Sequence, residues 1–106
     1  MKKCLLSGVA LLLPVFAAAQ SSDPQVQLAR SLAATCANCH GTQGRAKGDM
    51  KPLAGMSADK MLAMLADFRS GNQPATVMHQ LTKGYTEDQL RLIAQYLAAQ
   101  QPAPAR

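Results

Sequence analysis

Apolar residues recur every three or four positions through most of the chain, which is the spacing of one helix face. The first such segment follows Asp23-Pro24, a helix cap and a proline suited to the first helical turn. Its stripe repeats every four residues and consists of Leu28, Leu32 and Cys36. Ala29 and Ala33 form a smooth strip beside it that suits close approach of another helix. The spacing predicts a helix that runs from Asp23 directly into Cys36.

The helical pattern stops between Gly41 and Gly55, where glycines, a proline and polar residues leave no apolar periodicity. A loop of this length is unusual in a small domain unless it wraps something. Ser57 can cap a second helix that ends at Gly71-Asn72. The residues expected on its buried side are Met61, Leu62, Leu65 and Phe68.

Two more helical segments are predicted in the last third of the chain. A short one is expected to start within residues 73–76, to run through Leu81 and to stop at Gly84. Thr86 to Gln89 matches a capping box before the last helix. The apolar face of that helix is Leu90, Ile93, Ala94 and Leu97, and we expect Tyr96, Leu92 and Leu97 to pack against Leu28 and Leu32. Prolines at 102 and 104 predict a frayed tail. The chain is therefore expected to be all-α.

The amino terminus has the features of an export signal. Met1-Lys2-Lys3 is positive, residues 5–16 are largely apolar, and Ala17-Ala18-Ala19 offers the small residues of a cleavage site. Twelve residues reach about 18 Å as a helix, which is too short for a hydrocarbon core of about 30 Å. We expect a cleaved signal peptide over residues 1–19, a periplasmic location, and a mature domain over residues 20–106 without a membrane span.

Length and charge narrow the class of protein. A chain of 106 residues allows one small domain and excludes a multidomain catalyst. The formal net charge of +5 includes the two leader lysines, and basic residues do not alternate with aromatic ones, so nucleic-acid binding is not expected. Below about 100 residues a purely apolar core is marginal. Two cysteines remain after cleavage, too few for a disulfide framework, so we expect a cofactor to complete the core.

Residues 36–40 read Cys-Ala-Asn-Cys-His, the C-x-x-C-H pattern of covalent haem attachment. The thiols of Cys36 and Cys39 can each add to a vinyl group of one haem, and His40 then lies under the iron as its proximal ligand. Two other readings are weaker. A C-x-x-C redox pair requires a preceding strand, and a zinc site requires a second pair of ligands, whereas only the distant His79 is left. We expect one covalent haem c.

The second axial ligand must lie downstream of His40. Met78 stands in a short segment between Pro74 and Gly84 that can close over the other haem face. Its neighbour His79 points about 100° away around a helix, so only one of the two can face the iron. The other candidates are Met50, Met56, Met61 and Met64, of which the last two fit a core stripe better.

At these residues the chain resembles a class I cytochrome c, and the resemblance extends over nearly all of residues 20–106. It implies about four helices wrapped around one haem, with the first and last helices crossing. It also implies that the carbonyl of Pro52 accepts the Nδ1–H of His40, which would fix the histidine tautomer, and it favours Met78 as distal ligand. Tyr85 is a further candidate to pack on the haem or to bond a propionate.

More narrowly, Asp67 to Gly71, Ala75 to Met78 and Lys83 to Thr86 are similar to the cytochrome subunit of flavocytochrome c sulfide dehydrogenases. That resemblance implies a non-enzymatic electron-transfer subunit that accepts electrons from an FAD-containing, sulfide-oxidising subunit and passes them to another cytochrome. The alternative is a free-standing diffusible cytochrome that serves a terminal oxidase or another redox partner. A third reading, an enzyme with an open haem position, requires that Met78 does not bind iron.

Overall fold

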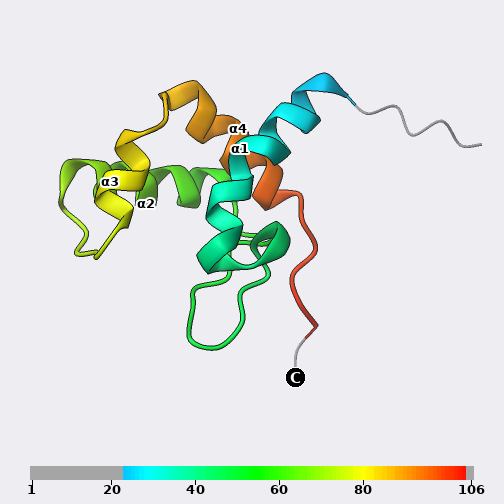
Figure 1. Cartoon of the computed structure of the whole chain (residues 1–106), viewed down its shortest axis with the longest axis horizontal. Coiled ribbons are helices and arrows are strands. Elements are labelled where there is room, and N and C mark those ends of the chain that lie inside the picture. The colour runs from blue at the N-terminus through cyan, green and yellow to red at the C-terminus, as the bar shows by residue number, and fades with distance from the viewer. Residues whose placement is uncertain (1–22, 105–106) are drawn as a thin grey trace, which may run out of the picture.

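A computed structural model describes residues 23–104 of the chain (Figure 1). The elements of this part are α1 (Pro24–His40), a 3₁₀ turn η1 (Thr42–Gly44), α2 (Ala58–Ser70), α3 (Met78–Lys83) and α4 (Glu87–Ala98). No strand occurs among these residues, and no helix among them combines the length and apolar character needed to cross a bilayer. The expected all-α fold is confirmed. The predicted signal peptide lies outside the described residues.

The predicted helix caps are present. The Asp23 carboxylate accepts the Gln25 N–H at 2.8 Å, and the Ser57 hydroxyl accepts the Lys60 N–H at 3.4 Å. At the start of α4, Thr86 and Gln89 bond each other's backbone N–H reciprocally at 2.9 and 3.2 Å, which is a capping box. These caps satisfy backbone donors that have no partner inside the helix, so three of the helix starts follow from local sequence.

The core forms where α1 crosses α4, with α2 packed against α4 and α3 packed against α2. Figure 1 shows α1 and α4 side by side near the middle of the described chain. The predicted face of α4 is buried as expected, and Ala94 is completely enclosed. On α1 only Ala29 and Ala33 are buried, whereas Leu28 is 51% exposed. The expectation that Leu28 packs into the core is therefore wrong, because the small side chains bring α1 close to α4 and leave the leucine beside the contact.

The short helix α3 begins later than predicted. It starts at Met78 rather than within residues 73–76, and it ends at Lys83, as expected from Gly84. Two features keep the preceding residues out of the helix. Pro74 disfavours helical backbone at Gln73, and the carbonyl of Gln73 lies 2.6 Å from the Nε2 of the His79 side chain. The segment before Met78 is thus an anchored turn.

The loop between α1 and α2 is closed on itself and fastened to the chain's end. The backbone N–H groups of Leu53 and Ala54 both donate to the Gly44 carbonyl, at 2.9 and 3.1 Å. The Arg45 Nε donates to the Gln101 carbonyl at 2.8 Å, and the Gly55 N–H donates to the Leu97 carbonyl at 3.0 Å. These bonds hold the residues that follow α4 as far as Gln101. Fraying of the tail that begins at Pro102 stays a prediction.

Gly41, directly after His40, has φ +79°, and a Cβ built on it would lie 2.1 Å from the Arg45 carbonyl oxygen. Gly41→Ala should therefore destabilise the protein by at least about 2 kcal/mol, since left-handed strain and a backbone clash add. Gly48 is the matched control, because its φ is +63° but nothing lies within 4 Å of the added carbon. Gly48→Ala should cost only about 1 kcal/mol. Denaturant unfolding of the cofactor-loaded variants measures both, and equal losses would contradict the clash argument.

Candidate cofactor-binding site

The last turn and a half of α1 presents Cys36, Cys39 and His40 together. Positions i, i+3 and i+4 share one face of a helix, so the three side chains project from the same side of α1. Both cysteines are free thiols; Cys36 is half-buried against the core and Cys39 is exposed. This donor set fits a haem attached by two thioethers and ligated by one imidazole.

The ring of His40 is held in place by the loop that follows it. Its Nδ1 lies 2.7 Å from the Lys51 carbonyl oxygen. A carbonyl can only accept, so Nδ1 donates. In the neutral ring Nε2 then keeps a free lone pair, which is the form of histidine that binds a metal. The structure thus places the acceptor one residue before the expected Pro52 carbonyl. The oxygen still belongs to the amide that Pro52 completes, and that amide has no N–H of its own.

Cys36 does not have the electrostatics of a reactive redox thiol. Burial raises the pKa of the Cys36 thiol above its ordinary value of 9.0, whereas reactive C-x-x-C cysteines have a lowered pKa. No strand precedes Cys36 among the described residues. Within residues 23–104 no three His, Cys, Asp or Glu side chains are grouped as ligands of one metal ion. The geometry therefore favours haem attachment over the redox and zinc readings.

Met78 and His79 have different surroundings at the start of α3. Met78 is half-buried, and its carbonyl accepts the Thr82 hydroxyl at 2.9 Å. The ring of His79 is turned to its own neighbours: Nε2 meets the Gln73 carbonyl, and the ring centroid lies 6.4 Å from that of Phe68. His79 would have to break its contact with the Gln73 carbonyl in order to bind iron through Nε2.

The other candidate methionines differ in their burial. Met61 is buried and Met56 packs against the same cluster, while Met50 is 42% exposed. The Tyr85 ring also packs on this cluster, and its hydroxyl donates to the Leu32 carbonyl of α1 at 3.4 Å. A contact of Tyr85 with haem stays a prediction.

His40 and Met78 belong to different pairs of packed helices. The packed pairs are α1 with α4, α2 with α4, and α2 with α3, so α1 and α3 do not form such a pair. In Figure 1 the carboxyl end of α1 and the α3 helix are separate, and α3 lies against α2. His40 and Met78 thus lie on helices that are not closely packed against each other.

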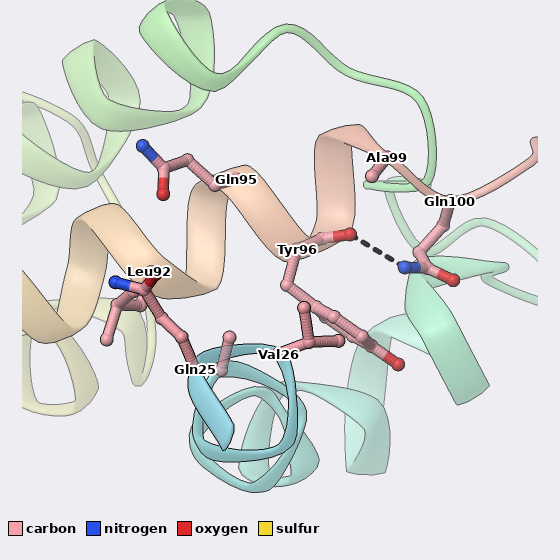
Figure 2. A pocket seen from close by; sticks show the side chains of 8 residues that line it. Gln25, Val26, Leu92, Gln95, Tyr96, Ala99 and Gln100 are labelled. Atoms are coloured by element: carbon pink, nitrogen blue, oxygen red, sulfur yellow. Dashed lines mark hydrogen bonds between the residues drawn. The ribbon is translucent and has the colours of Figure 1, made fainter. Parts of the chain in front are cut away.

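A groove of about 210 Å³ lies elsewhere, between the amino end of α1 and the carboxyl end of α4 (Figure 2). Figure 2 shows Val26 of α1 facing Tyr96 of α4, whose carbonyl accepts the Gln100 side-chain amide at 2.7 Å. A second cavity of about 280 Å³ lies between α2 and α4 and is lined partly by Arg69 and Arg91. None of the residues predicted to bind haem lines either cavity, so neither cavity is assigned as the haem site.

Sequence reasoning missed two groups near the predicted ligands. The Lys51 carbonyl is a backbone group, and the sequence marks this part of the loop only by Pro52, the next residue. Thr82 carries no motif, yet it is 1% exposed and bonds the backbone of Met78. The available signal was a threonine four residues after a candidate ligand on a short helix, a spacing at which hydroxyls often bond back to the carbonyl.

The cytochrome c family model matches residues 26–101. The chain therefore belongs to the cytochrome c family, and its fold is that of a class I cytochrome c. Membership of this family implies that the cofactor is haem c and that the chemistry is electron transfer. The residues that fit the cofactor are those already described at the end of α1.

The chain is also similar to three curated proteins. The chain is 38% identical over 65 residues to the cytochrome subunit of sulfide dehydrogenase of Chlorobaculum tepidum, which covers 61% of this chain and 59% of that protein. It is 33% identical over 64 residues to cytochrome c-552 of Acidithiobacillus ferridurans and 34% identical over 67 residues to the thiosulfate dehydrogenase electron acceptor of Stutzerimonas stutzeri. These matches cover 60% and 59% of this chain but only 28% and 31% of the two proteins.

If Cys36 and Cys39 carry the haem, its colour should stay with the polypeptide in acidified organic solvent, because thioether bonds survive this treatment. Cys36→Ala or Cys39→Ala alone should leave one bond and keep the colour attached, and the double variant should release it into the solvent. Absorbance of the solvent and of the protein pellet measures the partition. Free extraction from the unmodified protein would contradict covalent attachment.

Proposed function

We propose that this protein is a periplasmic, single-haem cytochrome c that transfers one electron at a time. Cys36 and Cys39 hold the haem and His40 ligates its iron. The observation that carries this assignment is the bond between His40 Nδ1 and the Lys51 carbonyl at 2.7 Å, next to two free thiols on the same helix face. That bond leaves Nε2 as an electron-pair donor aimed by the loop, which is the arrangement of an axial ligand.

We assign Met78 as the second axial ligand. Its thioether is a soft ligand that favours the ferrous state and raises the reduction potential relative to two histidines. His79 is bonded to the Gln73 carbonyl, and Met61 is buried in the core, which favours Met78 over these two candidates. With both axial positions supplied by the chain, the iron has no open position for a substrate. The protein then acts as a carrier of electrons and not as an enzyme.

The chain's own residues do the remaining work. The haem supplies the redox couple when bound. Cys36 packs against the edge of the apolar core, as do Leu32, Leu53 and Met56. Apolar side chains beside the attachment site would limit access of water and favour transfer of an electron through an exposed haem edge over reaction of small molecules at the iron.

The proposed electron donor is an FAD-containing, sulfide-oxidising flavoprotein, and the acceptor is another cytochrome. The support is the 38% identity to a cytochrome subunit of sulfide dehydrogenase. A second candidate is a free-standing diffusible cytochrome. It is favoured by the similarity to cytochrome c-552 and to a thiosulfate dehydrogenase electron acceptor, neither of which is named as a sulfide dehydrogenase subunit.

Met78→Ala should abolish the weak red-edge absorption band of methionine-ligated ferric haem and open the sixth position. The reduced variant should then bind carbon monoxide, seen as a prompt shift of the Soret band, whereas the unmodified protein should not. Met50→Ala is the matched control, because Met50 is an exposed methionine in the loop. Survival of the band in Met78→Ala, or its loss in Met50→Ala, would move the ligand elsewhere.

The partner is tested by purifying the native protein gently at low salt. The sulfide dehydrogenase assignment predicts a larger flavoprotein chain that elutes with this one and yields about one FAD per haem. Flavin fluorescence after denaturation and haem absorbance give that ratio. A haem-loaded monomer without flavin would favour the diffusible cytochrome and leave the haem assignment untouched.

A further inference from the structure

The helix that carries Met78 is short and has a weak start. α3 contains six residues, and Val77, at its amino-terminal cap, contributes no side-chain hydrogen bond. A helix of this length is not stable alone, because the first turn fixes several backbone angles for one hydrogen bond. The position of the Met78 backbone therefore depends on contacts that other side chains supply.

Thr82 supplies two of these contacts. Its Oγ1 lies 2.9 Å from the carbonyl oxygen of Met78 and 3.2 Å from that of His79, so its proton is donated to the first turn of α3. Thr82 is 1% exposed, the only polar side chain buried to this degree among residues 23–104. A buried hydroxyl without a partner is costly. The packing that encloses Thr82 therefore also fixes the two carbonyls that it reaches.

Helix stability does not account for a threonine here. Threonine is a poorer helix former than alanine or leucine, and a hydroxyl that bonds back to the i−4 carbonyl slightly weakens or bends a helix. An apolar residue of similar size would fill the same space without a hydroxyl to satisfy. What the hydroxyl adds is a fixed geometry at the two residues that begin the helix.

A second anchor precedes Met78 in the chain. The bond between His79 Nε2 and the Gln73 carbonyl, at 2.6 Å, holds the turn that enters α3. Thr82 holds the first turn of α3, which follows, through the Met78 carbonyl. The backbone of Met78 is thus fixed between two side-chain contacts, and neither contact uses its thioether.

From this arrangement we propose that Thr82 is a positioning residue for Met78: its buried hydroxyl holds the first turn of α3 so that the Met78 sulfur stays directed at the haem iron. The proposal rests on the assignment of Met78 as distal ligand. Thr82 touches neither the iron nor an electron-transfer partner in this scheme. It sets how readily Met78 leaves the iron.

The test is competition by imidazole, which displaces a methionine from ferric haem and removes the red-edge band. Thr82→Val keeps the shape but removes the hydroxyl, and it should raise the apparent affinity for imidazole by about two- to tenfold, the worth of one hydrogen bond. Thr82→Ser keeps the hydroxyl and should stay close to the unmodified protein. Thr86→Ala removes the cap hydroxyl of α4, outside the segment that holds Met78. It should lower the melting temperature by a few degrees without raising the affinity for imidazole.

Three results would overturn the proposal alone: unchanged affinity in Thr82→Val, an equal rise in Thr82→Ser, or an equal rise in Thr86→Ala. The last would mean that general loss of stability releases Met78. Absence of the red-edge band from the unmodified protein has a different meaning, because it removes Met78 as ligand and overturns both the ligand assignment and this proposal.

Discussion

The close crossing of α1 and α4 is the constraint on which the rest of the structure depends. It is made with small side chains: Ala29 and Ala33 on α1 are buried, and Ala33 belongs to the same cluster as Ala94. α1 continues without a break from this crossing to Cys36, Cys39 and His40. The direction that the crossing gives to α1 is therefore also the direction in which the haem-binding motif is presented to the rest of the fold.

The loop after His40 fixes the orientation of the His40 side chain. Its backbone closes on the Gly44 carbonyl, and Arg45 fastens it to the residues after α4. The carbonyl of Lys51 is held by the same loop and orients the His40 ring. Packing in the small apolar core would not fix the direction of the His40 ring by itself, because an imidazole without a hydrogen-bond partner rotates at little cost. The glycine-rich loop thus serves as part of the site as well as a connection between helices.

Prediction from the sequence was strongest where the signals are local. The caps at Asp23, Ser57 and Thr86 are present as expected, because each depends on side chains within three residues of the helix start. Prediction was weaker where one sequence pattern is compatible with two different packing arrangements. Leu28 and Ala29 lie on adjacent strips of α1, and only the choice of a close alanine contact decides that the leucine remains exposed.

The sequence by itself determined the chemistry: two thiols and an imidazole at fixed spacing on a helix, the family that this spacing marks, and the small set of downstream ligand candidates. These follow from covalent order and helical period, which need no knowledge of distant contacts. Only the tertiary structure decided that the Lys51 carbonyl orients His40, that His79 is used by the Gln73 carbonyl, and that α3 begins at Met78. Each of these is a hydrogen bond between residues six or more positions apart or a helix too short to form by itself, so each depends on how the chain packs.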